Sequence, residues 1–146
     1  MSSGGRYLHQ QMGWLTILVV LVGGLFVYIA FASTGLSWLG YLGLAVPILV
    51  AFLFGSLTVD VDRQRVHIRF GVGLIRRTWK LKDIASAERV RNPWWTGWGI
   101  RILPGRTVYN VAGFDAVEIT LHDGRCYRIG TDDPEGLERA IRARLK

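Results

Sequence analysis

The chain has no Asp, Glu, Lys or Arg between Arg6 and Asp60. This uncharged window contains two continuous apolar runs, 14–32 and 36–57, separated only by the residues Ser-Thr-Gly. At a rise of about 1.5 Å per residue, helices of these lengths cross a hydrocarbon core of about 30 Å. Lipid leaves no water to satisfy backbone groups, so each run must be helical. The sequence therefore predicts a transmembrane helical hairpin over residues 14–57.

Two alternatives to the hairpin come from the same residues. A pair of buried core helices in a soluble protein is disfavoured by the length of both runs. A cleaved secretory signal is suggested by Arg6 and by the small-x-small pattern at residues 30–32. The first run is longer than a typical signal core, and a second run follows almost at once. An uncleaved, multi-pass anchor is the favoured interpretation, and the cleaved signal stays as an alternative.

Charge predicts the orientation of the hairpin. The connector between the runs carries no charge, whereas the segment after Leu57 opens with five arginines: Arg63, Arg65, Arg69, Arg76 and Arg77. Basic residues near membrane ends stay on the cytoplasmic side. Both termini are therefore expected in the cytoplasm. The chain has a single cysteine, Cys126, which cannot form an internal disulfide and agrees with a reducing compartment.

The second apolar run has a face with little side-chain bulk. Small or compact residues recur there at every fourth position: Gly43, Pro47, Ala51 and Gly55. Residues at this spacing let helices approach closely in lipid. Gly23 and Gly24 of the first run offer a matching surface. Packing within the hairpin is favoured over an oligomer interface, and a homo-oligomer stays open.

From residue 58 onward, short alternating segments with turn signals between them predict eight strands, the last being 126–130. The final segment differs, because Thr131 or Asp133 can cap a helix and Pro134 suits its first position. The sequence predicts a small α+β domain at 58–146. Its expected form is an antiparallel β-barrel or sandwich of about 7–8 strands followed by a C-terminal α-helix.

Four segments carry a resemblance to a known family: NPWWTGWGIR, YNVAGFDAVEI, RIGTDDPEGLERAI and, more weakly, GLIRRTWKLKDIASAERV. With two preceding helices, they resemble bacterial membrane proteins that carry a pleckstrin-homology-like (PH-like) domain. The resemblance implies a short cytoplasmic N-terminus at 1–13, the hairpin, a cytoplasmic PH-like domain at 58–146, and location in the bacterial inner (plasma) membrane. Eukaryotic relatives often bind phosphoinositides through basic residues of the first hairpin. Arg63, Arg65 and Arg69 match that pattern only loosely, so no lipid specificity is implied.

The segment Arg91–Arg101 places three tryptophans between two arginines. If strands alternate in direction from the membrane outward, this loop returns to the membrane side together with residues 71–73, 112–114 and 131–133. The loops near residues 63–64, 82–83, 104–106 and 123–124 then lie at the far end. Three hypotheses follow: the tryptophans fill the core, sit among lipid headgroups, or line a site for a protein partner or ligand. The candidate contact residues are Arg91, Trp94, Trp95, Trp98 and Arg101.

No enzyme is expected, because the sequence has no activated nucleophile, no acid–base pair and no cofactor motif. His9, His67 and His122 have no metal-ligand spacing, so neither a metal nor a cofactor is expected. A nucleic-acid partner is not expected beside a membrane. The predicted function is a non-catalytic, membrane-tethered binding or scaffold module that contacts a protein partner or the lipid surface. The alternative is an accessory subunit of a transporter or membrane enzyme that acts through its transmembrane helices.

Overall fold

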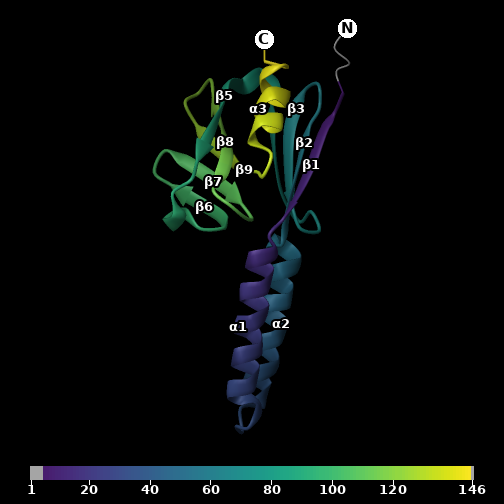
Figure 1. Cartoon of the computed structure of the whole chain (residues 1–146), viewed down its shortest axis with the longest axis vertical. Coiled ribbons are helices and arrows are strands. Elements are labelled where there is room, and N and C mark those ends of the chain that lie inside the picture. The colour runs from purple at the N-terminus through teal and green to yellow at the C-terminus, as the bar shows by residue number, and fades with distance from the viewer. Residues whose placement is uncertain (1–4, 146) are drawn as a thin grey trace.

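The protein consists of a helical hairpin that projects from a β-rich domain, with the start of strand β1 (Tyr7–Met12) and the end of helix α3 (Pro134–Arg142) at the opposite end of that domain (Figure 1). The computed structural model describes residues 5–145. Residues 1–4 of the expected N-terminal segment 1–13 lie outside this range. Lys146, the last residue of the expected domain 58–146, also lies outside it. The three α-helices are α1 (Trp14–Ala32), α2 (Ser37–Phe54) and α3 (Pro134–Arg142).

Helices α1 and α2 are long and apolar enough to cross a membrane. Helix α1 has the bounds expected for the first run, but α2 ends at Phe54 rather than at residue 57. Leu57 belongs to the following strand and is buried in the core of the domain. Hydropathy extended the helix too far, because a strand that starts in a core is as apolar as the end of a membrane helix.

The two helices pack through the glycines of their facing surfaces. A Cβ atom at Gly24 of α1 would lie 2.4 Å from the carbonyl oxygen of Gly43 and 2.6 Å from Cγ of Pro47 in α2. A Cβ at Gly55 would lie 3.0 Å from Cδ1 of Ile17. The neighbouring Gly23 faces open space, with no atom within 4 Å of such a Cβ. The low-bulk face of α2 is thus occupied by α1.

The first sheet contains β1 (Tyr7–Met12), β2 (Ser56–Val61), β3 (Arg65–Phe70) and β4 (Ile75–Lys80), in that order and all antiparallel. Strand β1 corrects the sequence analysis, which assigned residues 1–13 to a short N-terminal segment. Its sequence, YLHQQM, lacks an apolar alternation, so nothing in it indicates a strand. It forms because Tyr7 to Met12 pair with Val61 to Ser56.

The second sheet contains β5 (Ile84–Arg91), β6 (Gly99–Leu103), β7 (Arg106–Asn110), β8 (Asp115–Leu121) and β9 (Cys126–Gly130). Its strand order is β5-β8-β9-β7-β6. The expected all-antiparallel arrangement is wrong at one place, because β7 and β9 are parallel. Strand β8 lies between β5 and β9, so β7 can pair only with the free edge of β9. Within residues 5–145 the two sheets remain separate, so the strands do not close a hydrogen-bonded barrel.

One hydrophobic core joins the two sheets and α3. Trp79 of the first sheet packs against Tyr109 and Tyr127 of the second, with ring centroids 5.8 Å and 5.1 Å away. Helix α3 contributes three buried side chains: Leu137, Ala140 and Ile141. The expected cap is present, because Oδ1 of Asp133 accepts a hydrogen bond from the amide of Gly136 at 3.0 Å. The C-terminal helix therefore has both the start and the apolar face that its sequence indicates.

Strand β1 is held against the start of α3 by side-chain contacts. The hydroxyl of Tyr7 donates a hydrogen bond to Oδ2 of Asp133 at 3.0 Å. Burial raises the pKa of the Tyr7 phenol, and the hydrogen bond to Asp133 raises it further. Nε2 of His9 contacts Asp132 in the same turn. These contacts attach β1, which precedes the hairpin, to the turn before α3 at the end of the domain that follows the hairpin.

The hairpin and the domain meet at a hydrogen-bonded junction. The amide of Gly13 donates to the carbonyl of Gly55 at 2.8 Å, directly between the end of β1 and the start of β2. Oγ1 of Thr16 donates to the carbonyl of Val111 at 3.0 Å, and Nε2 of Gln11 donates to that of Ala112 at 2.9 Å. The β7–β8 loop is thereby attached to the first turn of α1, which fixes the hairpin relative to both sheets.

The glycine contact between α1 and α2 can be tested with two adjacent substitutions. Gly24→Ala places a methyl group against backbone and Pro47, so we expect a loss of about 1–3 kcal/mol in unfolding free energy. Gly23→Ala is the matched control, because it adds the same methyl where space is open and gains up to about 1 kcal/mol of helix propensity. Denaturant unfolding in micelles, followed by circular dichroism, measures both. Equal effects would contradict the packing described here.

Candidate functional site: a tryptophan edge at the hairpin end

The tryptophan loop connects β5 to β6 and is anchored to the domain by two buried polar residues. The amide of Asn92 donates to the carbonyl of Phe114 at 2.6 Å, and Oδ1 of Asn92 accepts from Arg128 at 3.2 Å. Thr96 is buried, and its amide donates to the carbonyl of Pro93 at 3.0 Å. Between these anchors, residues Trp94–Thr96 form a single 3₁₀ turn, η2. The loop is therefore an ordered turn with fixed ends.

The turn directs two of the three tryptophans outward. Trp94 is 81% exposed and Trp95 is 61% exposed, whereas Trp98 is half-buried with its indole nitrogen enclosed. Gly97 and Gly99 have positive φ angles of 67° and 97°, a backbone conformation that favours glycine. The core hypothesis therefore fails for Trp94 and Trp95, and Trp98 is the one that packs against the domain.

Both flanking arginines are exposed. The guanidinium carbon of Arg91 lies 5.9 Å from the centre of the Phe114 ring, which is a cation–π distance. A Cβ at Gly97 would lie 3.4 Å from Nη2 of Arg101, so this side chain folds back toward the turn. Over residues 5–145, neither arginine forms an ion pair with a carboxylate. Both positive charges are available to an anion outside the chain.

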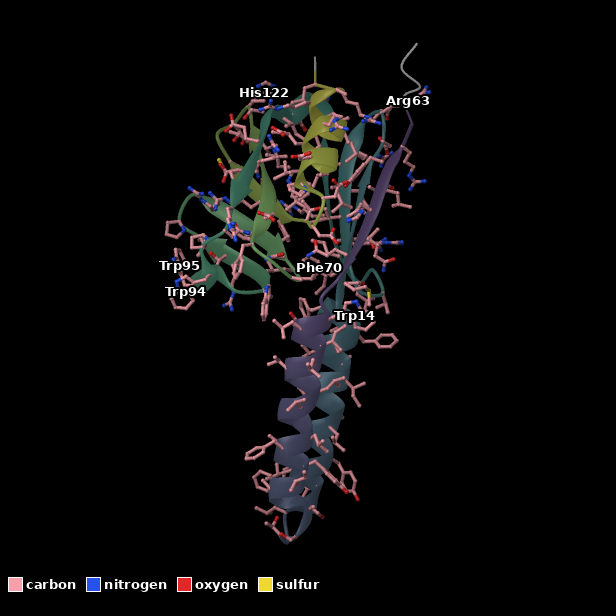
Figure 2. The ribbon with its side chains drawn as sticks, in the orientation of Figure 1. Trp14, Arg63, Phe70, Trp94, Trp95 and His122 are labelled. Atoms are coloured by element: carbon pink, nitrogen blue, oxygen red, sulfur yellow. The ribbon has the colours of Figure 1, made fainter. Side chains whose placement is uncertain are left out.

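The tryptophans lie at the end of the domain from which the hairpin emerges. Figure 2 shows Trp94 and Trp95 close to the level of Trp14, the first residue of α1, while Arg63 and His122 lie at the opposite end. The alternating strand directions predicted this placement. Loop 131–133 was also expected at the hairpin end. In the structure it lies against β1, where Asp132 contacts His9.

Two further loops bring exposed apolar side chains to the hairpin end. In the β3–β4 loop, Val72 is 56% exposed and Leu74 is 75% exposed. Gly71 of this loop abuts the last turn of α2, since a Cβ there would lie 2.0 Å from the carbonyl oxygen of Phe52. Phe114 belongs to the β7–β8 loop that contacts α1. The name tryptophan edge is used below for Val72, Leu74, Trp94, Trp95 and Phe114 together with Arg91 and Arg101.

Sequence reasoning placed these loops on one side but did not select Val72, Leu74 or Phe114 as contact residues. The usable signal was the apolar character of the expected near-side loops.

The same reasoning placed the histidines far apart, and the structure gives each of them different surroundings. Nδ1 of His67 lies 2.6 Å from Oγ1 of Thr78, His9 contacts Asp132, and His122 lies at the far end (Figure 2). In the described part of the chain, no three His, Cys, Asp or Glu side chains gather as metal ligands would.

The tryptophan edge combines large amphipathic rings with free guanidinium groups beside an apolar hairpin. Indole rings are favoured at the depth of lipid headgroups, and arginine is attracted to anionic headgroups. Aromatic and arginine side chains are also enriched at protein interfaces.

Comparison of the sequence with models of protein families and with curated protein sequences finds no match.

The exposure of Trp94 and Trp95 has a direct consequence for stability. We expect Trp94→Ala and Trp95→Ala to change the free energy of unfolding by less than about 0.5 kcal/mol, as surface substitutions do. Trp79→Ala is the control, because Trp79 is buried between the sheets and its loss should cost about 3–5 kcal/mol. Hydrogen exchange of β8 and β9 amides in the full chain measures the three effects. A large loss at residue 94 or 95 would show that the loop carries core packing.

Proposed function

We propose that this chain is a non-catalytic, membrane-tethered module whose tryptophan edge seats the domain on the lipid surface. In this proposal α1 and α2 span the inner membrane of a bacterial cell, both termini lie in the cytoplasm, and the β-rich domain is PH-like. The module holds its opposite end away from the bilayer for a partner protein.

The observation that carries the proposal is the level of the exposed tryptophans. Trp94 and Trp95 project from the domain near the level of Trp14, where the apolar helix begins (Figure 2). If α1 spans the bilayer, Trp14 lies at the interface, and the tryptophan edge lies at a similar depth. Indole rings are favoured there, because the ring is apolar while its N–H remains solvated.

The flanking charges support lipid contact at this edge. Arg91 and Arg101 have no carboxylate partner among residues 5–145, so each can contact a lipid phosphate. A basic residue near an anionic leaflet contributes about 1 kcal/mol of attraction. The apolar residues Val72 and Leu74 supply a further contact from the first sheet. The backbone hydrogen bond from Gly13 to Gly55 connects the hairpin directly to the first sheet, without a linker between them.

The accessory-subunit hypothesis receives less support. That role would use the low-bulk face of α2 to bind the helices of another protein. In the hairpin, Gly43 and Pro47 on that face already contact Gly24 of α1. The outward surfaces of both helices consist of large exposed side chains such as Phe26 and Phe52, which suit contact with lipid tails.

Depth measurement tests the seating of the tryptophan edge. Nitroxide labels are attached at Trp94→Cys and Trp95→Cys, in a Cys126→Ser background, with the full chain in bilayer nanodiscs. We expect power-saturation electron paramagnetic resonance to place both labels at headgroup depth. A label at His122→Cys is the control and should be fully aqueous, because His122 lies at the opposite end (Figure 2).

The same labels identify the competing outcome. Labels at 94 and 95 that are as aqueous as the label at 122 would overturn lipid seating. Immobilisation of these labels only when a copurified protein is present would instead assign the edge to protein recognition.

A further inference from the structure

A basic cavity lies at the end of the domain opposite the hairpin. Its volume is about 720 Å³, within the range of ligand sites. Its lining comes from the β2–β3 turn, β4, the 3₁₀ turn Leu81–Asp83, the start of β5, the β8–β9 turn and the C-terminal segment. Six basic side chains contribute to this lining: Arg63, Arg65, Lys80, Lys82, His122 and Arg144. No acidic side chain lines it.

Most of the positive charge in this cavity is uncompensated. Among residues 5–145, Arg65 is the one basic residue of the lining with an acidic partner, Asp62, and its Nε lies 3.4 Å from Oδ2 of that residue. Throughout the described chain, Arg63, Lys80 and Lys82 form no ion pair. Arg144 donates to the backbone carbonyls of Ala140 and Gly5, which fix the guanidinium without neutralising it. Such a cavity favours an occupant with several negative charges.

The cavity is continuous with an open sheet edge. Strand β4 is the last strand of the first sheet and, within residues 5–145, pairs with β3 alone. Its residues Thr78 and Lys80 line the cavity. The amide of Leu81 donates to Gln64 in the turn before β3. Because amides alternate along an antiparallel strand, those of Arg76, Thr78 and Lys80 point away from β3. An exposed edge of this kind accepts an added strand.

We propose that β4 and the basic cavity together form a docking site for an extended acidic segment of a partner protein. The segment adds to β4 as a further strand, so that its backbone pairs with the outward amides. Its carboxylates then reach Lys80, Lys82 and Arg63. This site is separate from the tryptophan edge and does not depend on where that edge sits.

An extended peptide fits these features better than other anions. With α1 and α2 spanning the bilayer, as proposed above, lipid headgroups would lie at the hairpin end, whereas Arg63 and His122 lie at the opposite end of the domain (Figure 2). Among the described residues, the lining contains no Phe, Tyr or Trp, and its one aromatic ring is the imidazole of His122, so it lacks the series of rings on which successive bases stack. A compact polyanion would use the charges but would leave the β4 edge unpaired. Only an extended backbone uses both the charge and the open strand.

The test uses the full chain in nanodiscs of zwitterionic lipid and a blocked heptapeptide of alternating glutamate and valine. We expect saturable binding, with the amides of Arg76, Thr78 and Lys80 gaining protection from hydrogen exchange. The double variant Lys80→Gln/Lys82→Gln should weaken binding about fivefold or more, since each exposed pair contributes a factor of roughly two to five. The control double variant Arg69→Gln/Arg139→Gln removes the same charge outside the cavity and should change binding less than about twofold.

Four outcomes would overturn the proposal. A fully N-methylated peptide of the same charge cannot pair with β4, so equal binding of that peptide would exclude strand addition. If tripolyphosphate displaces the peptide, and peptide binding does not change the hydrogen-exchange protection of the β4 amides, the cavity would be assigned to a compact anion. Equal weakening by the two double variants, or no saturable binding by the first peptide, would leave only general charge attraction and reject the site.

Discussion

The structure depends on the junction where the two apolar helices, α1 and α2, join the two paired strands β1 and β2. Met12 and Ser56 are partners in the β1–β2 register, and the next contact toward the hairpin is the hydrogen bond from Gly13 to Gly55. Strand pairing and helix packing therefore follow one another without a linker. A helical hairpin brings its two ends together, and the hydrogen bond from Gly13 to Gly55 narrows the gap to the spacing of about 4.7–4.9 Å that neighbouring strands require. The first sheet is thus oriented by the helices below it (Figure 1).

The directions of the remaining strands follow from that junction. Strand β2 leaves the hairpin, and each later strand reverses direction, even where the sheet order is not sequential. The parallel pair β7 and β9 obeys the same rule, because both strands return toward the hairpin end. Three loops that follow returning strands, 71–74, 92–98 and 111–114, therefore lie near the helices, whereas loop 131–133 packs against β1. The turns after β2, β4 and β8, which follow departing strands, contribute to the basic cavity at the opposite end. This alternation separates the tryptophan edge from the basic cavity.

The sequence predicts local elements of this protein well and their assembly less well. The first helix, the eight strands after the hairpin and the Asp133 cap are all visible as periodicity or turn chemistry. Strand β1 is invisible, because its pairing energy comes from β2, which lies across the whole hairpin. The order β5-β8-β9-β7-β6 is likewise set by which strand edges remain free. Long-range pairing of this kind leaves no mark on the local sequence.

The candidate sites show the same division. Trp79 and Trp94 are the same residue type, yet one is buried against Tyr127 and the other is 81% exposed. Strand alternation buries Trp79, whereas the orientation of Trp94 depends on a 3₁₀ turn held by Asn92 and Thr96. A cluster of tryptophans therefore shows that a loop is unusual without showing which rings are free.

Charge and apolar surface are distributed along one axis of the molecule. At the hairpin end, exposed rings and aliphatic side chains lie beside Arg91 and Arg101, which have no carboxylate partner among residues 5–145, a mixture suited to a membrane–water interface. At the far end, the cavity is lined by cations, and its neighbouring strand has unpaired backbone groups. A basic site close to an anionic bilayer would be filled by the headgroups themselves. The six-residue strands of the first sheet span about 20 Å, or roughly two Debye lengths of about 8–10 Å, so a basic site at the far end is largely screened from a leaflet at the hairpin end. If the hairpin spans a membrane, the length of the sheets provides that separation and leaves the basic cavity accessible to a charged partner.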